Sequence, residues 1–248
     1  MDRPVTALLC RTSDRGPQAA AGTRELAELL DARVIGTPGK PRSAGWQDDL
    51  ADSCGCLLEA GGQIDDAFAA GRRPILLAGE CSISVATLPV VVGHHPDARV
   101  LWLDAHGDFN TPATTTSGYL GGMCLAGACG LWDTGFGAGL DPARVIMHGV
   151  RDVEADERVA LDRCGVYRLE AAESLAGMKL FVHLDLDVLD PDEHPARFPA
   201  AGGLSPLALR EFLAQVVRVA DVLGAEVTAA APDYGEVAAD AIAPLLAP

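Results

Sequence analysis

Positive charge is scarce in this sequence of 248 residues. It has 19 lysine and arginine residues against 35 aspartate and glutamate residues, which gives a formal net charge of −16 at pH 7. An acidic surface of this kind repels nucleic acids and anionic membranes, so we expect neither as a partner. The same charge is compatible with a cationic substrate or with bound metal ions, although most acidic residues in such a chain are solvated surface groups.

The sequence also lacks long apolar runs and a recognisable secretory signal. No stretch approaches the roughly 18 consecutive apolar residues that a membrane-spanning helix needs. Met1-Asp2-Arg3 leads directly into a short apolar run at 5–10 that is typical of a strand. The seven cysteines include Cys54 and Cys56, but no second cysteine or histidine pair at zinc-binding spacing accompanies them. We therefore predict a cytoplasmic protein whose cysteines are reduced thiols.

Short apolar runs rich in valine, isoleucine and leucine alternate with segments of helical period. Strands that are nearly continuous in hydrophobicity and alternate with helices predict a parallel sheet covered on both faces. The predicted strands cover 5–10, 74–78, 99–103, 144–147, 165–169, 180–186 and 226–230, and the predicted helices cover 18–30, 47–70, 156–163 and 205–223. The expected fold is a three-layer α/β/α arrangement around a mostly parallel sheet.

One segment, 107–139, breaks this alternation because it is rich in glycine, threonine and aromatic residues. Long irregular segments after strands are where α/β folds place their functional groups. The sequence shows no internal repeat, no low-complexity tract and no linker, so residues 1–248 are predicted to form a single domain.

The motif LWLDAHGDFN at 101–110 carries the strongest functional signal. An apolar strand ends in Asp104, His106 and Asp108, and alternate residues of an extended chain point to one side at intervals of about 6.6 Å. Carboxylate and imidazole groups together suit divalent ions such as Mn²⁺. On this motif alone, a strand end decorated with turn-forming aspartates and a surface histidine remains an open alternative.

A second motif, FVHLDLDVLDP at 181–191, weakens that alternative. Asp185 and Asp187 share one face at the end of a buried strand, where two carboxylates repel each other unless a cation compensates. Two such strand ends fit a site of two metal ions about 3.5–4 Å apart. Asp190 precedes a proline and is predicted to form a turn, while His183 is predicted to be a core histidine with a satisfied hydrogen bond.

These two motifs resemble the paired metal-binding motifs of the arginase/agmatinase (ureohydrolase) family, D-A-H-x-D and D-x-D-x-x-D-P. The segment AGECS at 78–82 stands where the family has G-G-D-H-S, and GGLS at 202–205 matches a family segment that follows the second metal strand. The resemblance covers most of the chain and implies two Mn²⁺ ions that activate water for attack on a guanidino carbon. The metal ligands that it implies are Cys81, Asp104, His106, Asp108, Asp185 and Asp187.

The resemblance also implies roles in the reaction. Asp104 and Asp185 would bridge the two ions, and Asp108 would pass a proton to the leaving amine. The loop 108–118 resembles the segment with which arginases hold an amino acid's α-carboxylate, and the matching residues are the neutral donors Asn110, Thr115 and Ser117. Glu154 stands where the family's acid receives the α-amino group. The implied substrate is an α-amino acid rather than a decarboxylated amine.

Three positions depart from the family pattern. Cys81 replaces a histidine ligand, and Glu80 beside it replaces an aspartate. Gly121 stands where arginases have a histidine that is assigned to proton transfer, and Ala229 stands where the family has a glutamate that pairs with the guanidinium. Glu226 lies on the opposite strand face from Ala229, so Glu236 is the nearby acid left to replace that glutamate.

Cys81 and the segment GYLGGM at 118–123 resemble one branch of the family, the Nω-hydroxy-arginine hydrolases of D-cycloserine biosynthesis, although that branch keeps the glutamate. A hydroxyguanidine is less basic than a guanidine and depends less on a carboxylate partner. The leading hypothesis is hydrolysis of a guanidino or hydroxyguanidino amino acid to ornithine and urea or hydroxyurea. An uncharged amide or amidine substrate, and a non-catalytic protein that binds metal or an amino acid, stay open. The family's frequent trimers and hexamers leave a homo-oligomer open too.

Overall fold

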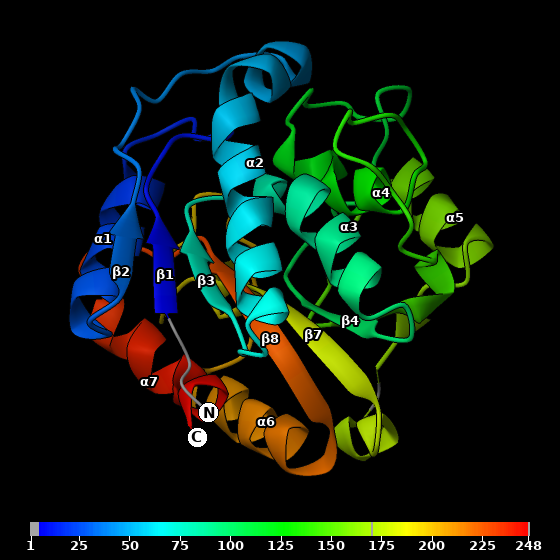
Figure 1. The fold of residues 1–248 in the computed structure, drawn as a ribbon. Coiled ribbons are helices and arrows are strands. Elements are labelled where there is room, and N and C mark those ends of the chain that lie inside the picture. The colour runs from blue at the N-terminus through cyan, green and yellow to red at the C-terminus, as the bar shows by residue number, and fades with distance from the viewer. Residues whose placement is uncertain (1–4, 170, 248) are drawn as a thin grey trace.

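Eight parallel strands form the central sheet in the computed structural model, which describes residues 5–169 and 171–247 (Figure 1). Their order across the sheet is β2-β1-β3-β8-β7-β4-β5-β6, and each neighbouring pair is parallel. The strands are β1 Val5–Leu8, β2 Arg33–Ile35, β3 Ile75–Ala78, β4 Arg99–Leu103, β5 Val145–His148, β6 Tyr167–Arg168, β7 Lys179–Asp185 and β8 Asp221–Thr228.

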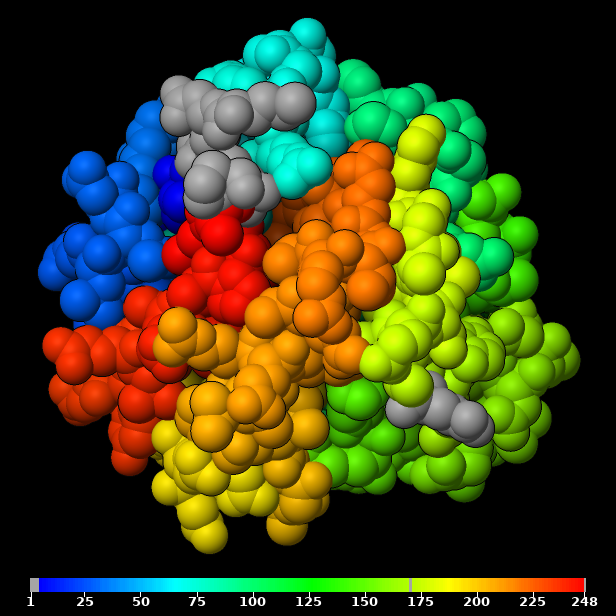
Figure 2. Space-filling view, turned by 90° about the horizontal axis from the view of Figure 1, so that it is seen from below, coloured from blue at the N-terminus to red at the C-terminus, as the bar shows by residue number. Residues whose placement is uncertain are grey.

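Helices cover both faces of this sheet, which confirms the predicted three-layer α/β/α architecture. One apolar core lies between the sheet and α1, α6 and α7, and the other between the sheet and α2 to α5. Figure 1 shows α2 and α3 lying across one face, and Figure 2 shows side chains of α6 and α7 (orange and red) at the centre of the view from below. The helices are α1 Gln18–Leu29, α2 Trp46–Ala69, α3 Ser84–His94, α4 Cys124–Ala128, α5 Ala155–Arg163, α6 Pro206–Val219 and α7 Gly235–Leu246.

Strand β7 shows why the apolar runs are continuous. Leu180, Val182 and Leu184 belong to the core beneath α6 and α7, and the intervening Phe181 belongs to the core beneath α2 and α3. A strand that is buried on both faces needs apolar side chains at odd and even positions alike.

The strand order brings four carboxyl ends together at the centre of the sheet. After β3 the chain crosses to β4, and β7 and β8 later fill the two positions between them. The residues that follow β3, β8, β7 and β4 therefore meet at one edge of the sheet. In open α/β folds this edge is where ligands bind.

Two predicted boundaries were wrong at the junction between α6 and β8. The helix predicted over 205–223 ends at Val219, because Ala220 has an extended backbone (φ −116°, ψ 161°) and Asp221 starts β8 beside Lys179. The strand predicted over 226–230 accordingly begins five residues earlier. It ends at Thr228, because Ala229 adopts a left-handed backbone with φ 57°.

The structure also corrects the predicted state of the cysteines. Cys10, just after β1, and Cys56 of α2 form a disulfide, so the prediction that every cysteine is a reduced thiol was wrong. The two residues are 46 positions apart in sequence, and sequence alone cannot reveal such a pairing. The other five cysteines are free. No helix within the described residues is long and apolar enough to cross a membrane.

Candidate metal centre and substrate cavity

Buried carboxylates gather where β4 and β7 end. Asp104 follows β4 directly, Asp185 is the last residue of β7, and Asp187 lies in the short 3₁₀ turn Leu186–Val188. Their exposed fractions are 1%, 5% and 5%. His106 joins the two strand ends, because its Nδ1 lies 3.0 Å from Asp187 Oδ2 and 3.4 Å from Asp104 Oδ1. Both sequence motifs therefore converge on one site.

Two compact groups of donor atoms share Asp104. One contains Asp104, His106 and Asp187, and the other contains Cys81, Asp104 and His183. In each group the donor atoms lie within 4.8 Å of one another. A carboxylate common to two adjacent groups is the arrangement expected of a residue that bridges two metal ions.

Cys81 lies three residues beyond Ala78, the last residue of β3, at the start of the 3₁₀ turn Cys81–Ile83, and is buried. Its Sγ lies 2.8 Å from Asp185 Oδ2 and 3.2 Å from Thr228 Oγ1. Burial and the neighbouring carboxylates raise the pKa of this thiol well above its usual value. The structure thus brings Cys81 and Asp185 to the site, in line with the predicted ligand set.

Asp108 lies at a sharp turn of the backbone with φ 48°, and its carboxyl group faces the cavity beside His106. Its main-chain oxygen accepts hydrogen bonds from the first turn of α4, at Leu125 N and Ala126 N. Glu157 of α5 anchors the same loop by accepting a hydrogen bond from Phe109 N at 2.8 Å. The left-handed backbone at Asp108 is therefore held by both neighbouring helices.

The electrostatics of these acids favour a bound cation. Burial raises the pKa of Asp185 to about 7, with the charge of Asp187 adding to the effect, and burial also raises the pKa of Asp187 and Asp108. Burial lowers the pKa of His106, but its hydrogen bonds to Asp104 and Asp187 raise it to about 12. Carboxylates crowded into a buried site ionise together only when positive charge compensates them, so this donor set fits divalent metal ions.

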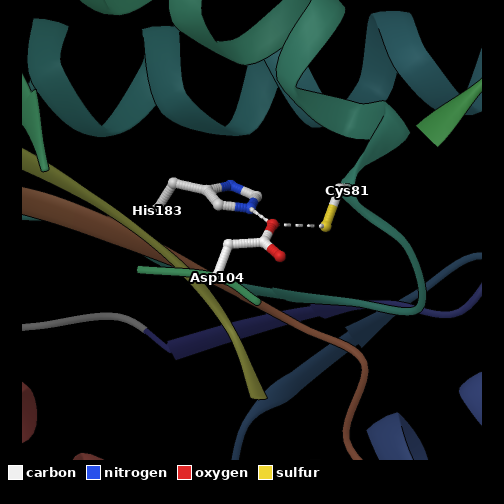
Figure 3. Close-up of side chains that lie close together, drawn as sticks. All are labelled: Cys81, Asp104 and His183. Atoms are coloured by element: carbon white, nitrogen blue, oxygen red, sulfur yellow. Dashed lines mark hydrogen bonds and ion pairs between the residues drawn. The ribbon is translucent and has the colours of Figure 1, made fainter. Parts of the chain in front are cut away.

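His183 is the donor that the sequence interpretation did not include. Its Nδ1 lies 2.7 Å from Glu226 Oε1, as expected of a core histidine, but its Nε2 is buried and has no hydrogen-bond partner. That nitrogen lies 4.0 Å from Asp104 Oδ2, and Figure 3 shows it pointing toward the Asp104 carboxylate. The sequence did contain a signal for this role. His183, Asp185 and Asp187 occupy alternate positions, so their side chains point to the same face of the strand.

Two hollows adjoin the metal residues, and Arg197 and Phe198 line both of them. No sequence motif pointed to these two residues, because their position depends on how the loop after β7 folds. The first hollow is lined by His106, Asp108, Asn110, Ser117, Tyr119 and Glu154, among others. The second is lined by Glu80, Asp185, Asp187, Ala229 and neighbouring residues.

Three of the four predicted substrate residues line the first hollow, and one does not. Asn110, Ser117 and Glu154 line the first hollow, and Asn110 Nδ2 lies 3.4 Å from Glu154 Oε2. Thr115 lies outside the lining, and its hydroxyl accepts a hydrogen bond from Gly118 N at 3.1 Å. Thr116 instead reaches Glu154, donating to Oε1 at 2.7 Å.

The departures from the family pattern have structural counterparts. The prediction that Glu236 could replace the family's glutamate, whose position Ala229 occupies here, was wrong. Glu236 lies in the first turn of α7 and lines a separate surface hollow together with Glu25. Three acids line the hollow beside Ala229, namely Glu80, Asp185 and Asp187. Glu80 is the one outside the predicted metal ligands, and its Oε2 accepts a hydrogen bond from Tyr119 Oη. Burial, followed by the charge of Asp14, raises the pKa of Glu80 to about 8.

Gly121 is required by the same tyrosine. A Cβ atom at this position would lie 2.5 Å from Cε1 of the Tyr119 ring, so a histidine there needs Tyr119 to move. The absence of the family's histidine is therefore coupled to the Tyr119–Glu80 hydrogen bond.

Arg151 anchors the turn that follows β7. The sequence comparison with arginases predicted a role for Glu154 in the same segment but none for Arg151. Its guanidinium donates to the main-chain oxygens of Asp187, Val188, Leu189 and Ala200, and to two others. Asp190 forms the predicted turn, accepting hydrogen bonds from Gly202 N and Gly203 N at 3.2 Å. Both contacts connect the turn after β7 to the segment before α6.

Known proteins are similar to this chain in sequence and in architecture. The model of the arginase family matches residues 48–247. The N(omega)-hydroxy-L-arginine amidinohydrolase of Streptomyces lavendulae is 35% identical over 251 residues, which span 95% of this chain and 92% of that protein. The arginase of Bacillus caldovelox is 33% identical over 167 residues, which span 57% of this chain and 56% of that enzyme.

Solved structures agree on the fold. The crystal structure of arginase from Bacillus subtilis superposes with a TM-score of 0.83 at 21% identity, over 100% of this chain and 99% of the other. These findings confirm the family that the two aspartate motifs predicted, including the similarity to a hydroxyarginine amidinohydrolase. The chain therefore belongs to the arginase family and is a hydrolase.

Proposed function

We propose that the chain is a binuclear manganese hydrolase that cleaves a linear C–N bond in an Nω-hydroxyguanidino or guanidino amino acid. The products would be ornithine and hydroxyurea or urea. The observation that carries this proposal is the position of Asp104 in two adjacent donor groups. Two ions at such a site lower the pKa of bound water and so supply a nucleophile at neutral pH.

The residues proposed to hold the two Mn²⁺ ions come from three strand ends. They are Cys81, Asp104, His106, Asp108, Asp185 and Asp187. Their donors are mainly carboxylate oxygens with imidazole and sulfur, a mixture that suits Mn²⁺ at the oxygen-rich positions and shifts preference toward softer metals near Cys81. The Mn²⁺ identity and the count of two ions are part of the proposal.

Asp108 is proposed to move the proton. Burial and the charge of Asp104 raise the pKa of its carboxyl group. Asp108 lines the hollow beside His106, and from there it would reach both the attacking water and the leaving nitrogen. A general acid in this position makes the amino group a better leaving group.

The first hollow is proposed to bind the amino-acid end of the substrate. Asn110, Thr115 and Ser117 would contact the α-carboxylate, and Glu154 would receive the α-amino group. Asn110 and Ser117 already line this hollow. Thr115 lies outside the lining, and its hydroxyl accepts from Gly118 N and so keeps its own proton to donate, while Glu154 accepts a hydrogen bond from Thr116. Neutral donors bind a carboxylate without burying another full charge.

The choice of hydroxyguanidine over guanidine rests on Ala229. A guanidinium placed in the hollow beside Ala229 has no carboxylate from that strand, and an unpaired buried cation is costly. Of the carboxyl groups that line this hollow, Glu80 is the one not proposed as a metal ligand, and its raised pKa favours the neutral acid. A less basic hydroxyguanidine suits such a partner, and the 35% identical relative bears the name of a hydroxyarginine hydrolase.

A second candidate keeps the metal centre and changes the bond. Ala229 makes its hollow less acidic than the family pattern requires, which favours an uncharged amide or amidine substrate. A non-catalytic member that binds metal or an amino acid is the third class. The buried carboxylates argue against this class, because uncompensated buried charges destabilise a fold and are not needed to stabilise it.

The substrate is tested by incubating the Mn²⁺-loaded protein separately with Nω-hydroxy-L-arginine, L-arginine and agmatine. Ornithine, putrescine, urea and hydroxyurea are then quantified by chromatography. The proposal predicts ornithine and hydroxyurea from hydroxyarginine at a rate well above that of urea from arginine, and no putrescine. Absence of product from all three substrates would overturn it, and tight substrate binding without turnover would establish the non-catalytic reading. The cytoplasmic location and a homo-oligomer stay predictions.

A further inference from the structure

The imidazole of His183 is fixed in one orientation by its neighbours. Its Nδ1 lies 2.7 Å from Glu226 Oε1, and the same carboxylate accepts hydrogen bonds from Ser84 Oγ and Thr87 Oγ1. His183 and Glu226 are both 0% exposed. With Nδ1 donating to a carboxylate, a neutral imidazole carries its free lone pair at Nε2.

That lone pair has no hydrogen-bond partner among the residues that the structure describes. His183 Nε2 is a buried nitrogen without a hydrogen bond, and an unsatisfied buried polar atom calls for an explanation. The ring cannot turn away, because the indole of Trp102 stacks on it at a centroid distance of 3.5 Å and an angle of 7°. The nitrogen is therefore held in place with its lone pair directed at the metal residues.

The atoms that it faces are metal donors. Nε2 and Cys81 Sγ each lie 4.0 Å from Asp104 Oδ2, on different sides of that oxygen (Figure 3). Metal–nitrogen and metal–oxygen bonds are about 2.0–2.2 Å and metal–sulfur bonds about 2.3 Å. Ligand atoms of one ion therefore lie roughly 3–4 Å apart, which these separations match.

We propose that His183 Nε2 coordinates the metal ion bound by Cys81 and Asp104, so that β7 supplies an imidazole to the half of the centre where Cys81 supplies sulfur. This inference rests on the proposed function, because it requires the two-metal centre. Glu226 then acts as a positioning residue, since a carboxylate that binds the other ring nitrogen of a ligand histidine fixes its tautomer and orientation.

The structural alternative is that His183 only packs against Trp102. The two readings differ in what metal binding does to Nε2. As a ligand, His183 brings its nitrogen to within about 2.3 Å of the ion. As a packing residue, it stays outside bonding distance and its removal affects stability without changing the metal count.

The direct test is a crystal structure of the wild-type protein grown with Mn²⁺, with the ions located by anomalous scattering. An ion within about 2.3 Å of both His183 Nε2 and Asp104 supports the inference. Two ions with His183 Nε2 more than about 3.5 Å from either would overturn it and leave the proposed metal centre intact. A protein that binds no Mn²⁺ at Asp104 would instead overturn the proposed function, and the inference with it.

Solution measurements extend the test to variants. In equilibrium dialysis against Mn²⁺, we expect His183→Asn to weaken one of two binding events by more than 100-fold, and Glu226→Gln to weaken it by about 10- to 100-fold. The matched control is His148→Asn, because the His148 ring stacks on Phe212 of α6 at 4.3 Å. His148 contacts Asp104 N through its main-chain oxygen, which the substitution keeps, so this variant should keep wild-type metal binding. Wild-type binding in a folded His183→Asn protein would overturn the inference. If that variant does not fold, the wild-type crystal structure decides.

Discussion

The indole of Trp102 lies flat against the imidazole of His183, with ring centroids 3.5 Å apart. The two residues are directly opposite each other in the register between β4 and β7, the strands that end in Asp104 and Asp185. Both rings are fully buried. The stack therefore sits beneath the candidate metal centre and packs together the two strands that carry its carboxylates.

Trp102→Leu removes this stack and leaves a cavity. We expect the free energy of unfolding, measured by urea denaturation, to fall by about 2–4 kcal/mol, because large buried aromatic residues cost about 3–5 kcal/mol when cut back to alanine. We also expect weaker Mn²⁺ binding, because the His183 ring is freed to rotate. Unchanged stability would show that the stack contributes little to the junction of β4 and β7.

Ala229→Glu restores the carboxylate of the family pattern at the second hollow. We expect kcat/KM for L-arginine to rise by about 10- to 100-fold, because a hydrogen bond to a charged group contributes about 1.5–3 kcal/mol. The preference for hydroxyarginine should shrink accordingly. Ala229→Gln is the matched control, because it adds the same bulk without charge. An equal gain in both variants would contradict the electrostatic explanation.

Arg151→Lys tests the clamp on the turn after β7. A lysine has three donors at a single nitrogen and cannot reproduce the planar fork that binds the oxygens of Asp187, Leu189 and Ala200. We expect the free energy of unfolding to fall by about 2–3 kcal/mol in urea titrations. The control is Arg210→Lys, whose exposed pairing with Asp240 should change stability by less than about 0.5 kcal/mol. Equal effects of the two substitutions would refute the clamp.

His194 gives the fold a pH dependence away from the metal residues. It is fully buried and its Nε2 accepts a hydrogen bond from Ala231 N. Burial lowers its pKa to about 4, below the about 6.5 of an unfolded histidine. The folded state therefore favours the neutral ring, and the associated stability is complete above about pH 6.5 and is lost as the pH falls toward 4.

We expect His194→Gln, which keeps an acceptor for Ala231 N, to reduce the loss of stability between pH 6.5 and 4 by on the order of 3 kcal/mol. The measurement is urea denaturation of both proteins across this range. Parallel pH profiles for the wild type and the variant would contradict the assignment.

The sequence was most informative where chemistry and periodicity coincide. Asp104, His106, Asp185 and Asp187 could be brought together from their strand parity alone, because the carboxyl ends of parallel strands share one edge. The central strands were also found from their apolar runs. The short edge strand β2 was missed because three residues carry too little pattern, and two of the three are exposed.

Other features depend on tertiary contacts that no local pattern encodes. His183 was assigned to the core on its depth in the strand, and only the structure shows that one of its two nitrogens has no partner. The place of Arg197 and Phe198 in the lining of both hollows follows from how the loop after Asp190 folds. The pairing of Cys10 with Cys56 similarly depends on the packing of α2 beside β1.

The two-metal centre is tested most directly by counting Mn²⁺ in the purified protein after equilibrium dialysis, using elemental analysis. The account predicts two ions per chain for the wild type and one for His106→Ala, which empties only the half of the centre shared by Asp104 and Asp187. Asp104→Ala should weaken both sites, since Asp104 belongs to both donor groups. A wild-type protein that holds one ion or none under saturating Mn²⁺ would contradict the account.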